Sequence, residues 1–186
     1  MSTATTTPAS TVTWNIDRAH SAAEFKVKHM MISNVKGSFS QLSGSLTEHT
    51  VDSTLSSVQA SVPVSTVNTG DPQRDGHLKS ADFFDAEKFP TLDFKSTNVV
   101  RKGDADYEVT GDLTIRGVTK QVTFKVEGPS APGKDPWGNT RIGLSATTKI
   151  NRKDFGLNWN AALEAGGFLV GDDVTINLDV QFIKAA

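Results

Sequence analysis

Period-two alternation of apolar and polar side chains is the feature that most constrains the fold of this chain. In "VTINLDVQF", every second residue from Val174 to Phe182 is apolar, and the residues between them are polar. Successive side chains of a β-strand point to opposite faces, so this pattern predicts a strand with one buried and one solvated face. The pattern recurs in "AEFKVKH", "SVQASVPV", "LDFKS", "YEVTGDLTIR", "VTFKVE" and "IGLSATTKI".

Short turn sequences such as "KGDAD" (102–106) and "RGVTK" (116–120) separate these segments. Short connections between consecutive strands indicate antiparallel neighbours. A sheet of eight or nine such strands with one apolar face curls and closes, because closure removes its exposed edges. The sequence therefore predicts an all-β fold, an antiparallel barrel that is either filled by side chains or holds one small ligand. The small residues Ala23, Ala60 and Ala146 on the inward faces are compatible with a cavity.

Helical signals are few. In "TGDPQRDGHLKS", Asp71 suits the N-cap, Pro72 the first helical position and Lys79 the last turn, which predicts one short helix midway along the chain. The segment "NAALEAGG" (160–167) is a second candidate, ended by its two glycines.

Composition excludes several classes of protein. The formal net charge is −2, from 19 basic and 21 acidic residues, and no Lys/Arg cluster indicates nucleic-acid binding. The chain has no cysteine, which excludes a disulfide scaffold and a thiol nucleophile. No apolar run is long enough to span a bilayer. The start, "MSTATTTPASTVTWNID", lacks the basic and apolar regions of a secretory signal, so we expect a cytoplasmic protein with a disordered tail at 1–12 and one domain at 13–186.

The stretch "RDGHL" is the main candidate for a polar site. Arg74 and His77 share one face of the predicted helix, where they could meet the polar head of a ligand at the barrel mouth. Alternatively, Arg74 and Asp75 form a salt bridge that pins the helix to the rim, and structural ion pairs outnumber functional ones. His29 ends an inward strand face and belongs to the same predicted rim.

Recognised catalytic and metal motifs are absent from the sequence. His20, His29, His49 and His77 show neither H-E-x-x-H nor H-x-H spacing, so we expect no metal site. No G-x-S-x-G and no phosphate-binding glycine motif occurs. We therefore expect no catalytic residue and no cofactor.

Four long motifs in fixed order carry a family resemblance: "WNIDRAHSAAEFKVKHMMISNVKGSFS", "RDGHLKSADFFDAEKFPTLDFKS", "GDLTIRGVTKQVTF" and "INRKDFGLNWNAALEAGGFLVGDDVTI". Together, over residues 13–184, they resemble the YceI family of bacterial lipid-binding proteins. The resemblance implies a lipocalin-like, eight-stranded antiparallel barrel with a short helical cap and an elongated internal apolar cavity. It implies a polyisoprenoid, isoprenoid quinone or similar long-chain amphiphile as ligand, no catalytic activity, and a possible homodimer. Many members carry a signal peptide, from which this sequence departs.

Combining the alternation with this resemblance gives a predicted ligand-binding site. The residues expected to line the cavity are Phe25, Val27, Val58, Val62, Leu78, Phe83, Phe84, Phe94, Leu113, Phe124, Leu144 and Ile176. The expected head-group and rim residues are Arg74, Asp75, His77 and His29.

Three functions remain open from the sequence. The favoured one is a carrier, store or stress-related buffer for an isoprenoid lipid. The second is a structural or interaction barrel with a packed core, which a cavity would contradict. The third is an enzyme acting on such a lipid, which turnover of a bound lipid would reveal.

Overall fold

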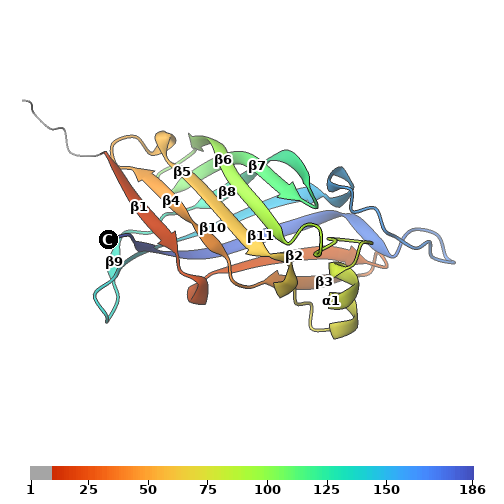
Figure 1. The fold of residues 1–186 in the computed structure, drawn as a ribbon. Helices are drawn as coiled ribbons and strands as arrows, with labels where there is room; N and C mark the ends of the chain where they lie inside the picture. Colours follow the sequence, from red (N-terminus) through yellow and green to blue (C-terminus); the bar gives the residue numbers. More distant parts are fainter. Residues whose placement is uncertain (1–9) are drawn as a thin grey trace, which may run out of the picture.

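A single antiparallel sheet closes on itself in the computed structural model, which describes residues 10–186 (Figure 1). The strands are β1 (Thr11–Ile16), β2 (Ala22–His29), β3 (Ser33–Phe39), β4 (Ser43–His49), β5 (Ser57–Pro63), β6 (Thr91–Arg101), β7 (Asp106–Ile115), β8 (Val118–Glu127), β9 (Gly133–Lys134), β10 (Thr140–Asn151) and β11 (Val170–Lys184). The helical elements are α1 (Pro72–Lys79) and the 3-10 turns η1 (Arg18–His20), η2 (Ser53–Leu55), η3 (Val64–Thr66) and η4 (Arg152–Phe155).

The barrel has eight strand positions, as the sequence and the resemblance predicted. β1 and β2 share one position and β3 and β4 share the next, whereas β9 lies outside the ring. β1 and β2 pair with the same edge of β11, and β4 and β3 pair with β1 and β2 in turn. These four strands therefore form one long hairpin, interrupted at 17–21 and 40–42. The order then continues through β5, β6, β7, β8 and β10, and β10 pairs with the other edge of β11 to close the ring.

The N-terminal boundary differs from the expected one. Residues 1–9 of the predicted tail lie outside the described residues, whereas Thr11 and Val12 belong to β1. The run "TVTWNI" places Trp14 inward, 3% exposed, and Thr11 pairs with His49 of β4. The first strand thus begins within the segment that was expected to be tail.

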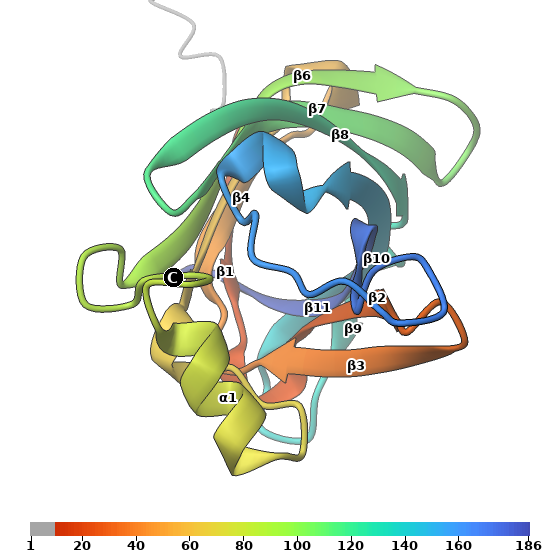
Figure 2. The same cartoon turned by 90° about the vertical axis from the view of Figure 1, so that its right-hand side faces the viewer.

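The helix formed where its capping residues predicted it. The Asp71 side chain accepts from the backbone N–H groups of Gln73 and Arg74, at 2.9 and 3.2 Å, and Pro72 begins α1. The helix lies in an insertion between β5 and β6 whose neck is closed by the Val64 N–H, which donates to the Pro90 carbonyl at 2.8 Å. The insertion lies beside the outer edge of β3 at one end of the barrel (Figures 1 and 2).

The second predicted helix, at 160–167, is wrong. This segment is a loop in which Ala162 and Phe168 form an isolated bridge, and Gly166 and Gly167 adopt positive φ angles. The Asn160 side chain donates to the Val170 carbonyl at 2.7 Å and accepts from the Val170 N–H at 3.0 Å. An Asn side chain that bonds backbone in this way competes with helix formation.

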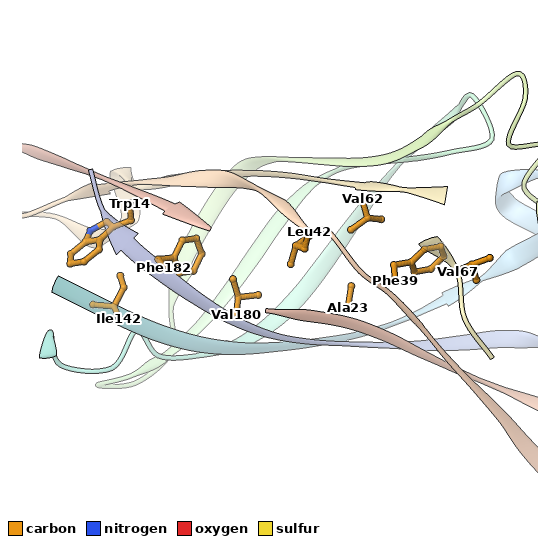
Figure 3. Close-up of a cluster of buried hydrophobic side chains, with 9 residues drawn as sticks. All are labelled: Trp14, Ala23, Phe39, Leu42, Val62, Val67, Ile142, Val180 and Phe182. Carbon is orange, nitrogen blue, oxygen red and sulfur yellow. The ribbon is translucent and has the colours of Figure 1, made fainter. Parts of the chain in front are cut away.

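One end of the barrel is filled by side chains, shown in Figure 3. Trp14, Ile142, Val180 and Phe182 pack there, and each is at most 4% exposed. We call these residues the plug. Ala23, Leu42 and Val62 continue the same cluster along the barrel axis toward Phe39 and Val67. The barrel is therefore solid at the end that contains the C-terminus.

An ion-pair network ties the outside of the plug end together. Arg141 of β10 donates to the Asp17 carboxylate, and its Nε donates to Asp135 Oδ2 at 2.6 Å. His20 Nδ1 lies 2.8 Å from Asp17 Oδ2. The bond from Arg141, with a smaller contribution from His20, lowers the pKa of Asp17 from 3.8 to about 2, and Arg141 likewise lowers the pKa of Asp135.

We expect this network to shape the acid stability of the barrel. A carboxyl whose pKa is lower in the folded state stabilises the fold above the unfolded-state pKa, and that contribution is lost as the pH falls toward the folded-state pKa. Arg141→Gln should therefore lower the free energy of unfolding at pH 7 and reduce its decline between pH 4 and pH 2, measured by urea unfolding. Arg101→Gln, which removes the exposed pair with Asp104, is the control. Equal pH profiles for wild type and Arg141→Gln would contradict the assignment.

Candidate functional site

An internal cavity of about 310 Å³ occupies the barrel beyond the plug, toward α1 and η4. Its lining begins at Ala23, Leu42 and Val62 and includes none of the four plug residues. Most of the lining is apolar. Its members on the strands and the helical insertion include Phe25, Val27, Val35, Phe39, Ala60, Leu78, Phe83, Phe84, Leu92, Phe94, Leu113, Ile115, Phe124, Ile150, Val174, Ile176 and Leu178.

Two glycines set how closely the aromatic rings approach the barrel wall. A Cβ on Gly37 would lie 2.3 Å from Cζ of Phe25, and a Cβ on Gly111 would lie 2.6 Å from Cζ of Phe94. Phe94 also packs edge-on against Phe124, with ring centroids 5.2 Å apart. These rings can approach the wall this closely only because Gly37 and Gly111 have no side chain.

Most of the residues expected to line a cavity do lie in its wall, but Val58 and Leu144 do not. Leu144 pairs with Val180 of the plug and packs into that solid end. Val58 lies opposite Leu46, two residues from Ala60 toward the plug end. Alternation placed both residues on the correct face of the sheet but not along the barrel axis. Contact of the other residues with a ligand stays a prediction.

Arg74 and Asp75 do not form the expected salt bridge with each other. Instead, both hold Thr69, at the start of the loop that leads into α1. Arg74 Nε donates to Thr69 Oγ1 at 2.7 Å and Nη2 donates to the Thr69 carbonyl at 2.9 Å. Asp75 Oδ1 accepts from the Thr69 N–H at 2.8 Å and from its hydroxyl at 2.6 Å. Arg74 also borders the cavity, whereas Asp75 does not. These two residues thus tie α1 to the loop that precedes it, and their side-chain bonds do not reach the barrel rim as expected.

His77 lies in an aromatic cluster at the mouth. Its ring packs edge-on against Phe83 and Trp159, with centroids 5.0 and 4.7 Å away, and Nε2 lies 2.9 Å from Asp82 Oδ2. His77 borders the cavity, as does His29 at the end of β2. The two histidines of the predicted rim thus lie where the cavity meets the loops.

Arg152 is a cavity residue that sequence reasoning missed. It is 3% exposed, and its guanidinium donates to the carbonyls of Gly171 at 2.8 Å, Leu157 at 2.6 Å and Trp159 at 2.9 Å. Asp172 is 3.8 Å away, too far for a hydrogen bond. Burial lowers the pKa of Arg152, and Asp172 opposes that effect. No local pattern points to Arg152 itself. The alternate spacing of Leu157 and Trp159, which also line the cavity, is the only indication in this segment of a cavity wall.

Among residues 10–186, no group of three or more His, Cys, Asp or Glu side chains is placed to hold a metal ion. Nor does the described part of the chain contain a helix that is both long and apolar enough to cross a membrane.

Comparison with known proteins assigns the family. Residues 14–182 match the YceI-like domain model. The chain belongs to the YceI family. A UPF0312 protein of Staphylococcus aureus (strain MSSA476) is 38% identical over 170 residues, which cover 91% of this chain and 96% of that protein.

Three solved structures share this fold. The Campylobacter jejuni YCEI protein is 30% identical, with a TM-score of 0.72, over 87% of this chain and 91% of that one. Burkholderia cenocepacia BcnA superposes with a TM-score of 0.75 at 23% identity, over 89% of this chain and 98% of that one. A polyisoprenoid binding domain from Saccharophagus degradans, implicated in plant cell wall breakdown, gives 0.67 at 17% identity, over 94% and 99%.

We expect Arg152 to hold the loop between η4 and β11 in place. Arg152→Met leaves buried carbonyls without donors and should lower the free energy of unfolding by about 3 kcal/mol, because hydrogen bonds to a charged group are each worth about 1.5–3 kcal/mol. Urea unfolding and limited proteolysis within 157–170 measure this. Lys153→Met, next in the chain and exposed, is the control. Equal stability of the two variants would show that the guanidinium is dispensable.

Proposed function

We propose that this YceI-family barrel binds the apolar chain of an isoprenoid lipid or isoprenoid quinone in its cavity, as a carrier or store and without catalysing a reaction on it. The observation that carries the proposal is the apolar cavity, which is closed by the plug at one end and opens toward the α1 end. Its 310 Å³ falls within the range of small-molecule sites, roughly 300–1,000 Å³. A packed barrel, the second hypothesis from the sequence, would have no such space.

The chemistry of the lining supports a ligand chosen by shape. No side-chain nitrogen or oxygen that is fully buried among residues 10–186 lacks a hydrogen-bond partner. Each CH₂ group removed from water contributes about 0.8 kcal/mol, which needs no directional contact. The family and the name of the Saccharophagus degradans domain support the isoprenoid class.

Two of the charged groups at the mouth have structural roles. Arg74 is bonded to Thr69 and Arg152 to backbone carbonyls, so neither guanidinium is directed at a substrate. His77 Nε2 is paired with Asp82, a contact that catalytic histidines also make. Turnover of a bound lipid is therefore the measurement that separates the enzyme alternative from the carrier.

The decisive test is gentle purification followed by organic extraction and mass spectrometry. We expect a stoichiometric long-chain lipid. The delipidated protein should also gain thermal stability from an added isoprenoid quinone, by about 2.7 kcal/mol at a free ligand concentration of 100 Kd. An empty extract together with no stabilisation by isoprenoid quinones or prenyl phosphates would refute the carrier proposal.

Filling the cavity should weaken binding without unfolding the barrel. Ala60 faces the cavity opposite Phe94, whereas its neighbour Gln59 faces solvent. Ala60→Phe should weaken quinone binding at least tenfold, because the added ring takes volume from the ligand, while Gln59→Phe should leave binding unchanged. Tryptophan fluorescence titration gives both affinities. Equal affinities for the two variants would place the ligand elsewhere.

Arg74 offers a test of head-group recognition. Its guanidinium is already bonded to Thr69, so we expect Arg74→Ala to weaken binding of a prenyl phosphate and of a quinone by the same factor, through displacement of α1. Parallel titrations of both ligands with wild type and variant measure this. A loss confined to the prenyl phosphate would instead assign Arg74 to the head group.

A further inference from the structure

Exposed apolar side chains gather on two loop ends beside the cavity mouth. Met30, Met31 and Ile32, in the turn between β2 and β3, are 43%, 70% and 79% exposed, and Phe168, in the loop before β11, is 58% exposed. We call these four residues the apolar tip. The Met30 N–H donates to the Leu169 carbonyl at 2.7 Å, and Met31 Sδ lies against Gly167. Figure 2 shows the two loops side by side at the end of the barrel that faces the viewer.

The tip is adjacent to the mouth but outside the cavity. None of its four residues lines the cavity, whereas the residues that flank them do, including His29 at the end of β2, Leu169 just before β11 and Val170 at its start. A surface that met the tip would therefore cover or border the opening through which a ligand passes.

The turn has methionines at two positions whose backbone conformation disfavours long side chains. Met30 and Met31 have φ angles of 51° and 59°, the left-handed region that long L side chains avoid. A hairpin turn with positive φ at successive residues normally takes Asn-Gly. Backbone strain and exposed apolar side chains at the same place mark positions where folding preference has been overridden, and such positions cluster at functional sites.

Three exposed lysines lie along the hairpin that carries Met30, Met31 and Ile32. Lys26 of β2 lies directly opposite Lys36 of β3, an arrangement that like charges disfavour, and Lys28 is two residues further along β2. None of the three forms an ion pair with any residue of the described chain. The acidic residues nearby are Glu24 on β2, Glu164 in the second loop, and Asp172 and Asp173 of β11, which lie where the register with β2 shifts beside Lys28. Asp172 is paired with Lys153 at 3.2 Å, and Lys153 also lies over the ring of Phe168.

We propose that the apolar tip inserts into the surface of an anionic lipid bilayer, with the hairpin lysines against its head groups, so that the cavity mouth faces the membrane. The inference deepens the proposed function, on which it rests for the nature of the cargo. Projecting apolar side chains beside basic residues suit a membrane interface. A stable protein partner would instead need roughly 800 Å² of complementary surface on each side, whereas the tip consists of four side chains.

The test is co-sedimentation of the purified chain with sucrose-loaded vesicles. We expect binding to vesicles of 70% phosphatidylcholine and 30% phosphatidylglycerol, and weaker binding to phosphatidylcholine alone. Changing the tip to Met30→Asn, Met31→Gly and Phe168→Ser should lower the partition coefficient at least tenfold. The Asn-Gly pair suits the turn, so this variant should unfold no earlier than wild type, which excludes misfolding as the cause.

Two further variants separate the contribution of the apolar tip from that of the hairpin lysines. Val51 and Leu55, 85% and 64% exposed in the connection between β4 and β5 at the plug end, provide equally apolar positions far along the barrel. Val51→Ser with Leu55→Ser should leave partitioning unchanged. Lys26→Gln with Lys36→Gln should remove the preference for the anionic vesicles. No binding by wild type, or an equal loss in the Val51/Leu55 variant, would overturn the proposal.

Self-association and cargo binding are distinguished in the same experiments. If light scattering shows that wild type is a dimer that the tip variant converts to a monomer, and neither sediments with vesicles, the tip joins two copies and the membrane proposal is wrong. If lipid is extracted from wild type but wild type does not sediment with vesicles, the membrane proposal is wrong and the carrier function stands. Vesicle binding by a protein that yields no lipid and gains no stability from quinone would overturn the carrier function alone.

Discussion

The pairing of both edges of β11 is the constraint on which the rest of this barrel depends. This fifteen-residue strand pairs with β10 along one edge and with β2 and then β1 along the other. The last strand of the chain therefore joins the first two strands to β10 and closes the ring. Closure satisfies backbone groups that would otherwise form open edges, and it fixes which side chains face inward. The cavity wall, the plug and the mouth all follow from that register.

The sequence predicted what period-two alternation controls. It gave the closed antiparallel barrel, and the Asp71–Pro72 signal gave α1, because capping is a local interaction. It did not give β3 and β4, "SNVKGSF" and "SGSLTEH", whose small and polar residues become strands through pairing with β2, β1 and β5. Tertiary pairing there overrides a weak local pattern.

For the candidate site, alternation predicted which side chains point inward but not their position along the barrel axis. Phe25 and Leu144 have the same pattern along their strands, yet Phe25 borders the cavity and Leu144 packs beside the plug. Depth depends on the stagger of strands around the barrel, which no single segment encodes. The role of Arg152 was hidden for a related reason, since its partners are backbone carbonyls, which every sequence has. The anchoring of Arg74 and Asp75 on Thr69 depends likewise on the path of a loop.

The plug has a consequence for the order in which a bound molecule arrives and departs. Trp14 and Phe182, 3% and 1% exposed, seal one end, which leaves the α1 end as the route through which the cavity meets solvent. The sealed floor is apolar, so under the proposed function an amphiphile would lie with its hydrocarbon end deepest. It would enter hydrocarbon end first and leave polar end first. An acceptor would then meet the polar end before the chain is released, which would give the transfer a direction.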